Sequence, residues 1–181
     1  MMMLFIWGFI VVLIIGIVFA AKKGIKQGNE LKEQTKSIGA LQGVFAKHVE
    51  GLGIGSVECK IFRFSDRVLI DSSRQRFEIY LTQFRAAEVK SMQELIDKSK
   101  SVVGRAMIGT LLVPGLGTIV GGMSGIGNKE KTSHYMIFNF IDAHGELSAV
   151  TFQDTFAFGM KDFCQGLNNS LPNDEASVVR L

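Results

Sequence analysis

The chain has 181 residues, 47% of them hydrophobic, and a formal net charge of +3. Its 20 Lys and Arg residues are scattered among 17 Asp and Glu residues, so the sequence has no basic stripe of the kind that binds nucleic acid. Cys59 and Cys164 lie far apart and form no CxxC motif, which argues against a disulfide framework or a zinc site. We therefore expect two reduced thiols, packed as small hydrophobic groups.

The N-terminal segment is a candidate membrane anchor. Leu4 to Ala21 is an uncharged run of 18 residues, 13 of which are Leu, Ile, Phe or Val. A helix needs about 20 such residues to cross a bilayer. Three lysines follow at once, and the positive-inside rule then places the N-terminus outside and the remaining chain in the cytoplasm. A cleavable signal peptide is the alternative, but no basic segment precedes the run, and the run is longer than a signal peptide requires.

An amphipathic helix is expected next. Leu31, Ile38, Leu41 and Phe45 recur at spacings of seven, three and four residues, interrupted by two glycines. We predict a juxtamembrane helix over residues 23–45 that packs on the following domain, or pairs with a second copy, rather than lying on lipid.

Strand patterns then dominate. Hydrophobic and polar residues alternate at 57–61 and 77–81, and a short apolar run covers 67–71, with turn-forming residues between them. A further strand is expected at 86–92, and a hairpin at 135–141 and 147–152 with its loop at 143–145. The last element is a helix beginning at Asp154 as its N-cap, with Phe156, Met160, Phe163, Cys164 and Leu167 on one face. Residues 169–181 form a flexible tail.

A glycine-rich stretch interrupts the strands. Between Arg105 and Lys129 lie 23 uncharged residues, among them seven glycines and Pro114. We predict an inserted hairpin of two short helices, bent at Pro114 and covering residues 101–130. Gly117, Gly121 and Gly125, four residues apart, would form its helix-packing face. The hairpin would expose the apolar residues of 107–120, including Val113, to a membrane or to another copy. A second membrane span over 106–128 and a disordered loop remain the alternatives.

Several segments resemble a group of bacterial proteins of uncharacterised function, whose domain is similar to pleckstrin-homology (PH) and GRAM domains and carries a glycine-zipper insertion. The residues that carry the likeness are 47–52, 58–60, 67–70, 103–122 and 135–137. The resemblance covers residues 46–168 and implies a strongly bent antiparallel sheet, closed at one end by the C-terminal helix. The expected class is therefore α+β: an anchor over residues 1–22, the helix over 23–45, and a PH-like domain with its insertion.

No catalytic, metal-binding or cofactor-binding residues are predicted. His48, His134 and His144 have no metal-ligand spacing, and Asp66 and Asp71 flank a short strand, as turn-capping residues do. Gly122 to Lys129 superficially resembles a phosphate-binding loop, but Asn128 stands where that motif needs lysine.

The sequence thus favours a non-enzymatic, single-pass protein of a bacterial inner membrane, with a PH-like sheet that binds a membrane protein or an anionic lipid headgroup. The candidate contacts are six cationic side chains: Lys60, Arg63, Arg67, Arg74, Arg76 and Arg85. The alternative is a structural membrane protein that self-assembles through the glycine-zipper hairpin, which makes a homo-oligomer a second expectation. Nucleic acid is not an expected partner.

Overall fold

The structure is a computed structural model that describes residues 22, 24–99, 107–108, 111–113, 133–155 and 157–172. The chain forms two compact units, Met1–Gly39 and Ala40–Leu181. The apolar run of the expected anchor, Leu4 to Ala21, and residues 173–181 of the expected tail lie outside the described residues. The tail predicted over 169–181 begins too early, because residues 169–171 continue the hydrogen bonding of the last helix and Leu171 packs against the core. Among the residues that are described, no helix has the length and apolar character needed to cross a membrane.

The first unit contains a helix over residues 24–37. The prediction that this helix continues to Phe45 is wrong. Gly39 adopts a left-handed conformation (φ 72°), and its N–H bonds to the carbonyl of Lys36 at 3.1 Å, which ends the helix. The strand β1 (Gln42–Glu50) follows in the second unit, with Val44 and Ala46 buried on alternate residues. The residues with apparent helical spacing therefore belong to two elements: Leu31 lies in the helix, and Phe45 lies in β1.

The second unit is built on a seven-stranded antiparallel sheet with the strand order β4-β3-β2-β1-β9-β8-β5. After β1, its strands are β2 (Glu58–Arg63), β3 (Arg67–Ser72), β4 (Arg76–Tyr80), β5 (Phe84–Ser91), β8 (His134–Ile141) and β9 (Leu147–Asp154). The first four strands form a meander, and β1 also pairs with β9, which joins the meander to β8 and β5. The α+β class and all six predicted strands are confirmed, although Leu81 begins a short 3-10 helix (Leu81–Gln83) and Met92 begins a helix.

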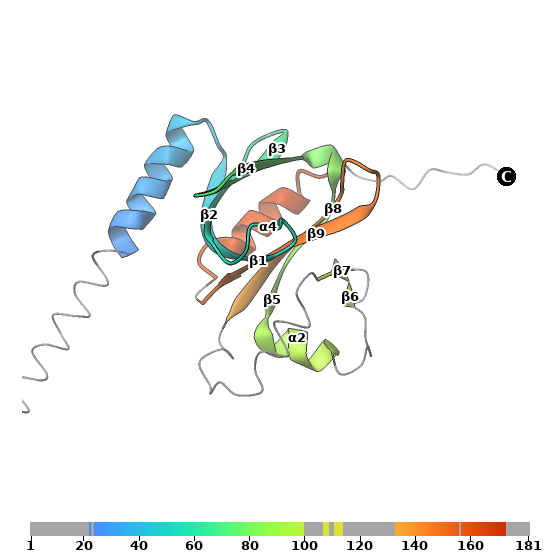
Figure 1. Cartoon of the computed structure of the whole chain (residues 1–181). Coiled ribbons are helices and arrows are strands. Elements are labelled where there is room, and N and C mark those ends of the chain that lie inside the picture. Colours follow the sequence, from blue (N-terminus) through green and yellow to red (C-terminus); the bar gives the residue numbers. More distant parts are fainter. Residues whose placement is uncertain are drawn as a thin grey trace, which may run out of the picture. The chain divides into compact units, whose positions relative to one another are not determined.

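The main core lies between the sheet and the C-terminal helix α4 (Met160–Asn168), around which the strands curve in Figure 1. Its centre is aromatic: the Phe138 ring stacks on Phe163 of α4 and meets the edge of Phe152 of β9, with centroids 6.0 and 5.7 Å apart. The predicted apolar face of α4 is confirmed for its four described members, which are Met160, Phe163, Cys164 and Leu167.

The predicted start of this helix at Asp154 is wrong. Asp154 pairs with His134 as the last residue of β9, so it belongs to the sheet. Ala157 and Gly159 then adopt left-handed conformations (φ 52° and 72°) that redirect the chain, and the helix begins at Met160. The expected core residue Phe156 lies outside the described residues.

A smaller apolar cluster forms between α2 (Met92–Ser99) and β8. Met92 and Leu95 pack there with Tyr135 and Ile137, and the fully buried Val113 joins them, contrary to its predicted exposure. Two-residue strands, β6 (Met107–Ile108) and β7 (Leu111–Leu112), pair with each other. The helical conformation predicted for these residues is wrong, because two apolar pairs around Gly109 and Thr110 are too short a pattern to separate helix from strand. Gly117, Gly121, Gly125 and the bend at Pro114 lie outside the described residues.

Candidate functional site

The outer face of the sheet, opposite the core, carries most of the charged side chains of β1 to β4. Alternation along each strand turns residues such as Ile61, Ile70 and Ile79 inward, where they are buried, and turns their neighbours outward. The strand register places Phe45, Lys60, Asp71 and Arg76 in one row across the four strands. We call this surface, from β1 up to its bulge after His48 through β4, the outer face; its remaining charged strand residues are Lys47, Glu58, Arg67 and Glu78.

Two adjacent hollows flank Phe45 on this face. The first, about 310 Å³, is bordered by Glu58, Lys60 and Asp71. The second, about 300 Å³, extends between Lys47 of β1 and Asp154 at the end of β9. Phe45 and Glu58 line both hollows, which we together call the Phe45 groove. The Lys60 ammonium lies 6.0 Å from the centroid of the Phe45 ring, so an aromatic surface lies directly beside charged groups.

The charges on the outer face compensate one another. Arg76 Nε lies 3.0 Å from Asp71 Oδ1, and this carboxylate raises the pKa of the Arg76 guanidinium. Arg67 lies 2.9 Å from Asp66, in the preceding turn, and 3.4 Å from Glu78. Counting that turn, the face carries four cations and four carboxylates: Lys47, Lys60, Arg67 and Arg76 against Glu58, Asp66, Asp71 and Glu78. Its formal net charge is therefore zero.

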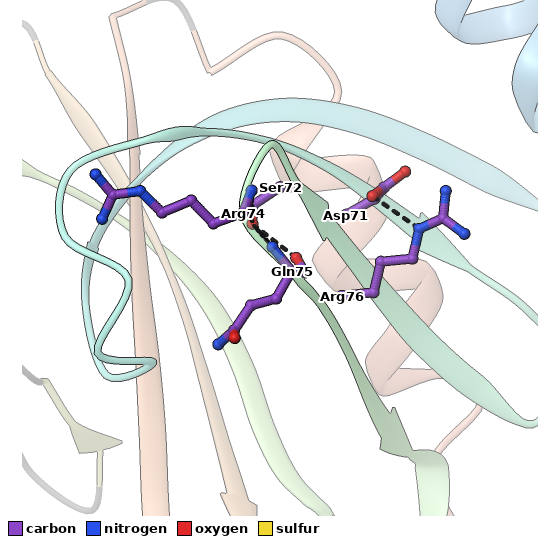
Figure 2. A network of polar contacts seen from close by, with 5 residues as sticks. All are labelled: Asp71, Ser72, Arg74, Gln75 and Arg76. Carbon is purple, nitrogen blue, oxygen red and sulfur yellow. Dashed lines mark hydrogen bonds and ion pairs between the residues drawn. The ribbon is translucent and has the colours of Figure 1, made fainter.

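Only three of the six predicted cationic contacts lie on this face: Lys60, Arg67 and Arg76. Arg74 belongs to the β3–β4 turn, which Ser72 closes by donating from its hydroxyl to the carbonyl of Gln75 at 2.6 Å. Figure 2 shows the Arg74 and Arg76 side chains extending from this turn to opposite sides. Arg74 Nη1 donates to the carbonyl of Ile54 at 2.6 Å and so is engaged by the β1–β2 loop.

The other two predicted contacts are also engaged elsewhere. Arg63 donates to the Gln42 side chain at 2.8 Å and to Ser170 at 3.1 Å, beyond the end of α4, and its partial burial lowers the pKa of the guanidinium. Arg85 on β5 donates to the carbonyls of Thr82 and Phe84. The six cations therefore do not converge on one cradle for an anion.

His48 holds the β1–β2 loop, a role that sequence reasoning did not assign. The imidazole is buried; its Nδ1 lies 2.6 Å from the carbonyl of Gly55, and its Nε2 accepts from the backbone N–H of Leu52 at 3.3 Å. These partners require a neutral ring with its proton on Nδ1. The glycines at 51, 53 and 55 that follow His48 are the sequence signal of a tight loop.

The described residues include no group of three His, Cys, Asp or Glu side chains that could hold a metal ion. Both cysteines are free and buried. Burial raises the pKa of the Cys59 thiol, and that of Cys164 to about 12, so both side chains are protonated at neutral pH. Protonated, buried thiols are poor nucleophiles.

The outer face and its Phe45 groove thus define the candidate site. Comparison of the sequence with models of protein families and with curated proteins gave no match.

Proposed function

We propose that this chain is a membrane-tethered binding module without catalytic activity, whose outer face binds a partner protein. The tether is the apolar run from Leu4 to Ala21, with Lys22 and Lys23 after it, which supports an inner-membrane location with the sheet in the cytoplasm. A meander of four strands, three further antiparallel strands and a C-terminal helix enclosed by the sheet support the likeness to PH and GRAM domains.

The balance of charge on the outer face is the observation that favours a protein over an anionic lipid. Attraction to an anionic membrane surface contributes about 1 kcal/mol for each nearby Lys or Arg, and this gain needs cations in excess. Here four carboxylates match four cations, and Asp71 and Glu78 lie beside the two arginines. A face of mixed charge around the half-buried Phe45 matches a partner protein with a complementary pattern of charges.

Site-specific photocrosslinking in living cells tests this function. The full chain, with a benzophenone amino acid in place of Phe45, is illuminated in the bacterial membrane and its adducts are separated by mass. We expect a discrete protein adduct. The matched control places the same group at Leu147, an exposed apolar residue at the opposite end of β9, and should not give that adduct.

Reversing the charge of Lys60 tests, in the same experiment, whether charge complementarity selects the partner. Lys60→Glu changes the sign of one charge beside Phe45 and should lower the adduct yield by about tenfold if charge complementarity selects the partner. Lys60→Arg keeps the sign and should preserve the yield. The proposal is wrong if Phe45 crosslinks only to lipid, if it gives no adduct, or if position 147 gives the same protein adduct.

A further inference from the structure

At the unpaired edge of β5, one side chain makes the hydrogen bonds that a neighbouring strand would make. β5 is the last of the described strands in the sheet, so one of its edges has no partner strand among them. Asn168, the last residue of α4, accepts from the N–H of Ala87 at 3.0 Å and donates to its carbonyl at 2.8 Å. One side-chain amide thus satisfies both backbone groups of one residue, as a residue of an adjacent strand does.

The register identifies the next free position on this edge. In an antiparallel ladder, alternate residues turn their N–H and C=O groups to the same side, so Val89 and Ser91 face the same edge as Ala87. The N–H of Ser91 bonds to the Glu94 carboxylate at 2.7 Å. Val89 lies between the two occupied positions, and no described residue bonds to its N–H and C=O groups on this edge, which an incoming strand can therefore use.

A groove runs beside this edge. It has a volume of about 380 Å³, lies between β5 and α4, and its lining includes Ala87, Val89 and Cys164. Glu88 also lines the groove, but it forms an ion pair with Lys90. Lys161 of α4 is exposed, and no described carboxylate forms an ion pair with it. Within the described part of the chain, the groove therefore offers a positive charge that no carboxylate compensates.

We propose that this edge binds an extended, acidic segment of a partner protein as an additional strand. The incoming backbone takes over the two hydrogen bonds that Asn168 makes to Ala87 and adds a pair at Val89. The exchange at Ala87 conserves the number of hydrogen bonds, so Asn168 holds the edge satisfied while the groove is empty. An acidic residue of the segment lies opposite Lys161. This site is distinct from the Phe45 groove, because β9 and β8 lie between β1 and β5 in the sheet.

Selection of linear peptides from a phage-displayed library on the full chain in lipid nanodiscs tests the proposal. We expect enrichment of acidic sequences rich in β-forming residues. Binding of one enriched peptide is then compared between Val89→Pro and Val89→Thr. Because the N–H of Val89 faces the free edge, proline leaves the ladder with β8 intact but removes the donor. We expect Val89→Pro to weaken binding by about tenfold, since hydrogen bonds to the peptide are lost, and Val89→Thr by less than about twofold.

Lys161→Glu provides a second readout that does not alter the strand. Lys161→Glu should weaken binding of the acidic peptide several-fold, whereas Lys161→Arg should leave it unchanged. The proposal is wrong if no peptide is enriched, or if the enriched peptides bind the Val89→Pro and Lys161→Glu variants as tightly as the unaltered chain. If peptides are enriched only after residues 173–181 are deleted, the chain's own tail occupies the groove, which overturns the assignment to a partner protein. These outcomes are independent of crosslinking at Phe45.

Discussion

Gly51 is a position where a single methyl group would disturb the fold. It has φ 110°, a conformation that side chains rarely adopt. A Cβ added there would overlap the carbonyl oxygen of Ala149 and lie 2.8 Å from Val150 Cα. The backbone of β9 cannot retreat from that contact without breaking its pairing with β8. Gly51 therefore permits the close approach of the β1–β2 loop to β9.

We predict that Gly51→Ala lowers the free energy of unfolding by about 3 kcal/mol, because it combines backbone strain with a clash against backbone. Gly53→Ala is the matched control: Gly53 also has positive φ (67°), but no atom lies within 4 Å of the added Cβ. It should cost only about 1 to 2 kcal/mol, the ordinary penalty for a left-handed residue. Urea unfolding followed by circular dichroism measures both. Equal losses would contradict the role given to Ala149.

Cys164 makes stability depend on alkaline pH. Burial raises the pKa of its thiol from 9.0 to about 12, so the folded state retains the proton between these two values while the unfolded state releases it. The folded chain then binds more protons, and the free energy of unfolding must fall as pH rises above 9. For one such group the slope reaches at most about 1.4 kcal/mol per pH unit.

This contribution is isolated by comparing the unaltered chain with Cys164→Ala. Lysines and tyrosines titrate over the same range in both proteins, so the difference between the two stability curves belongs to the thiol. We expect the gap to be constant below pH 8 and to change by more than about 1 kcal/mol by pH 10.5. Parallel curves across this range would contradict a buried, protonated Cys164.

At the scale of elements, α4 is fastened to β5 by Asn168. Asn168→Ala removes both bonds to Ala87, a residue that is only 1% exposed, and leaves its backbone groups without those partners. We predict a loss of about 2 to 3 kcal/mol in the free energy of unfolding, together with faster hydrogen exchange at the Ala87 amide. Gln165→Ala alters an exposed side chain of the same helix and should cost less than about 0.5 kcal/mol. A similar small effect for both variants would show that the helix does not depend on Asn168.

The strands could be predicted from sequence because alternation is local. Cys59 and Ile61, for example, alternate with charged neighbours within one strand. The end of the first helix could not be predicted, because the spacing from Ile38 to Phe45 fits a helix although Gly39 ends it. Met107 to Leu112 has two apolar pairs separated by Gly109 and Thr110, a pattern too short to show a helical or a strand period. Asp154 resembles an N-cap, and only its pairing with His134 shows that it belongs to a strand.

The candidate site was less predictable than the strands. The sequence identifies Lys60, Arg67 and Arg76 as cations, but it does not show that the register brings carboxylates between them. That register depends on pairing between strands, which no local pattern encodes. The hydrogen bonds between Asn168 and Ala87 link residues that are 81 positions apart, and no spacing in the sequence indicates them.

At the scale of the whole molecule, the account depends on a tether that holds the sheet at the cytoplasmic side of a membrane. The apolar run from Leu4 to Ala21 is long enough for one crossing, and the lysines after it favour one orientation. If residues 106–128 formed a second crossing instead, β8, β9 and α4 would be separated by a bilayer from the strands on which they pack. The fold of the second unit therefore argues against a second crossing at residues 106–128.

The most direct test is the position of the C-terminus relative to the membrane. A fluorescent reporter that matures only in the cytoplasm and an alkaline phosphatase that is active only outside are each fused behind Leu181. We predict fluorescence without phosphatase activity, in the membrane fraction, and release of the protein from that fraction when residues 4–21 are deleted. An active phosphatase with no fluorescence, or membrane association unchanged by the deletion, would contradict the account.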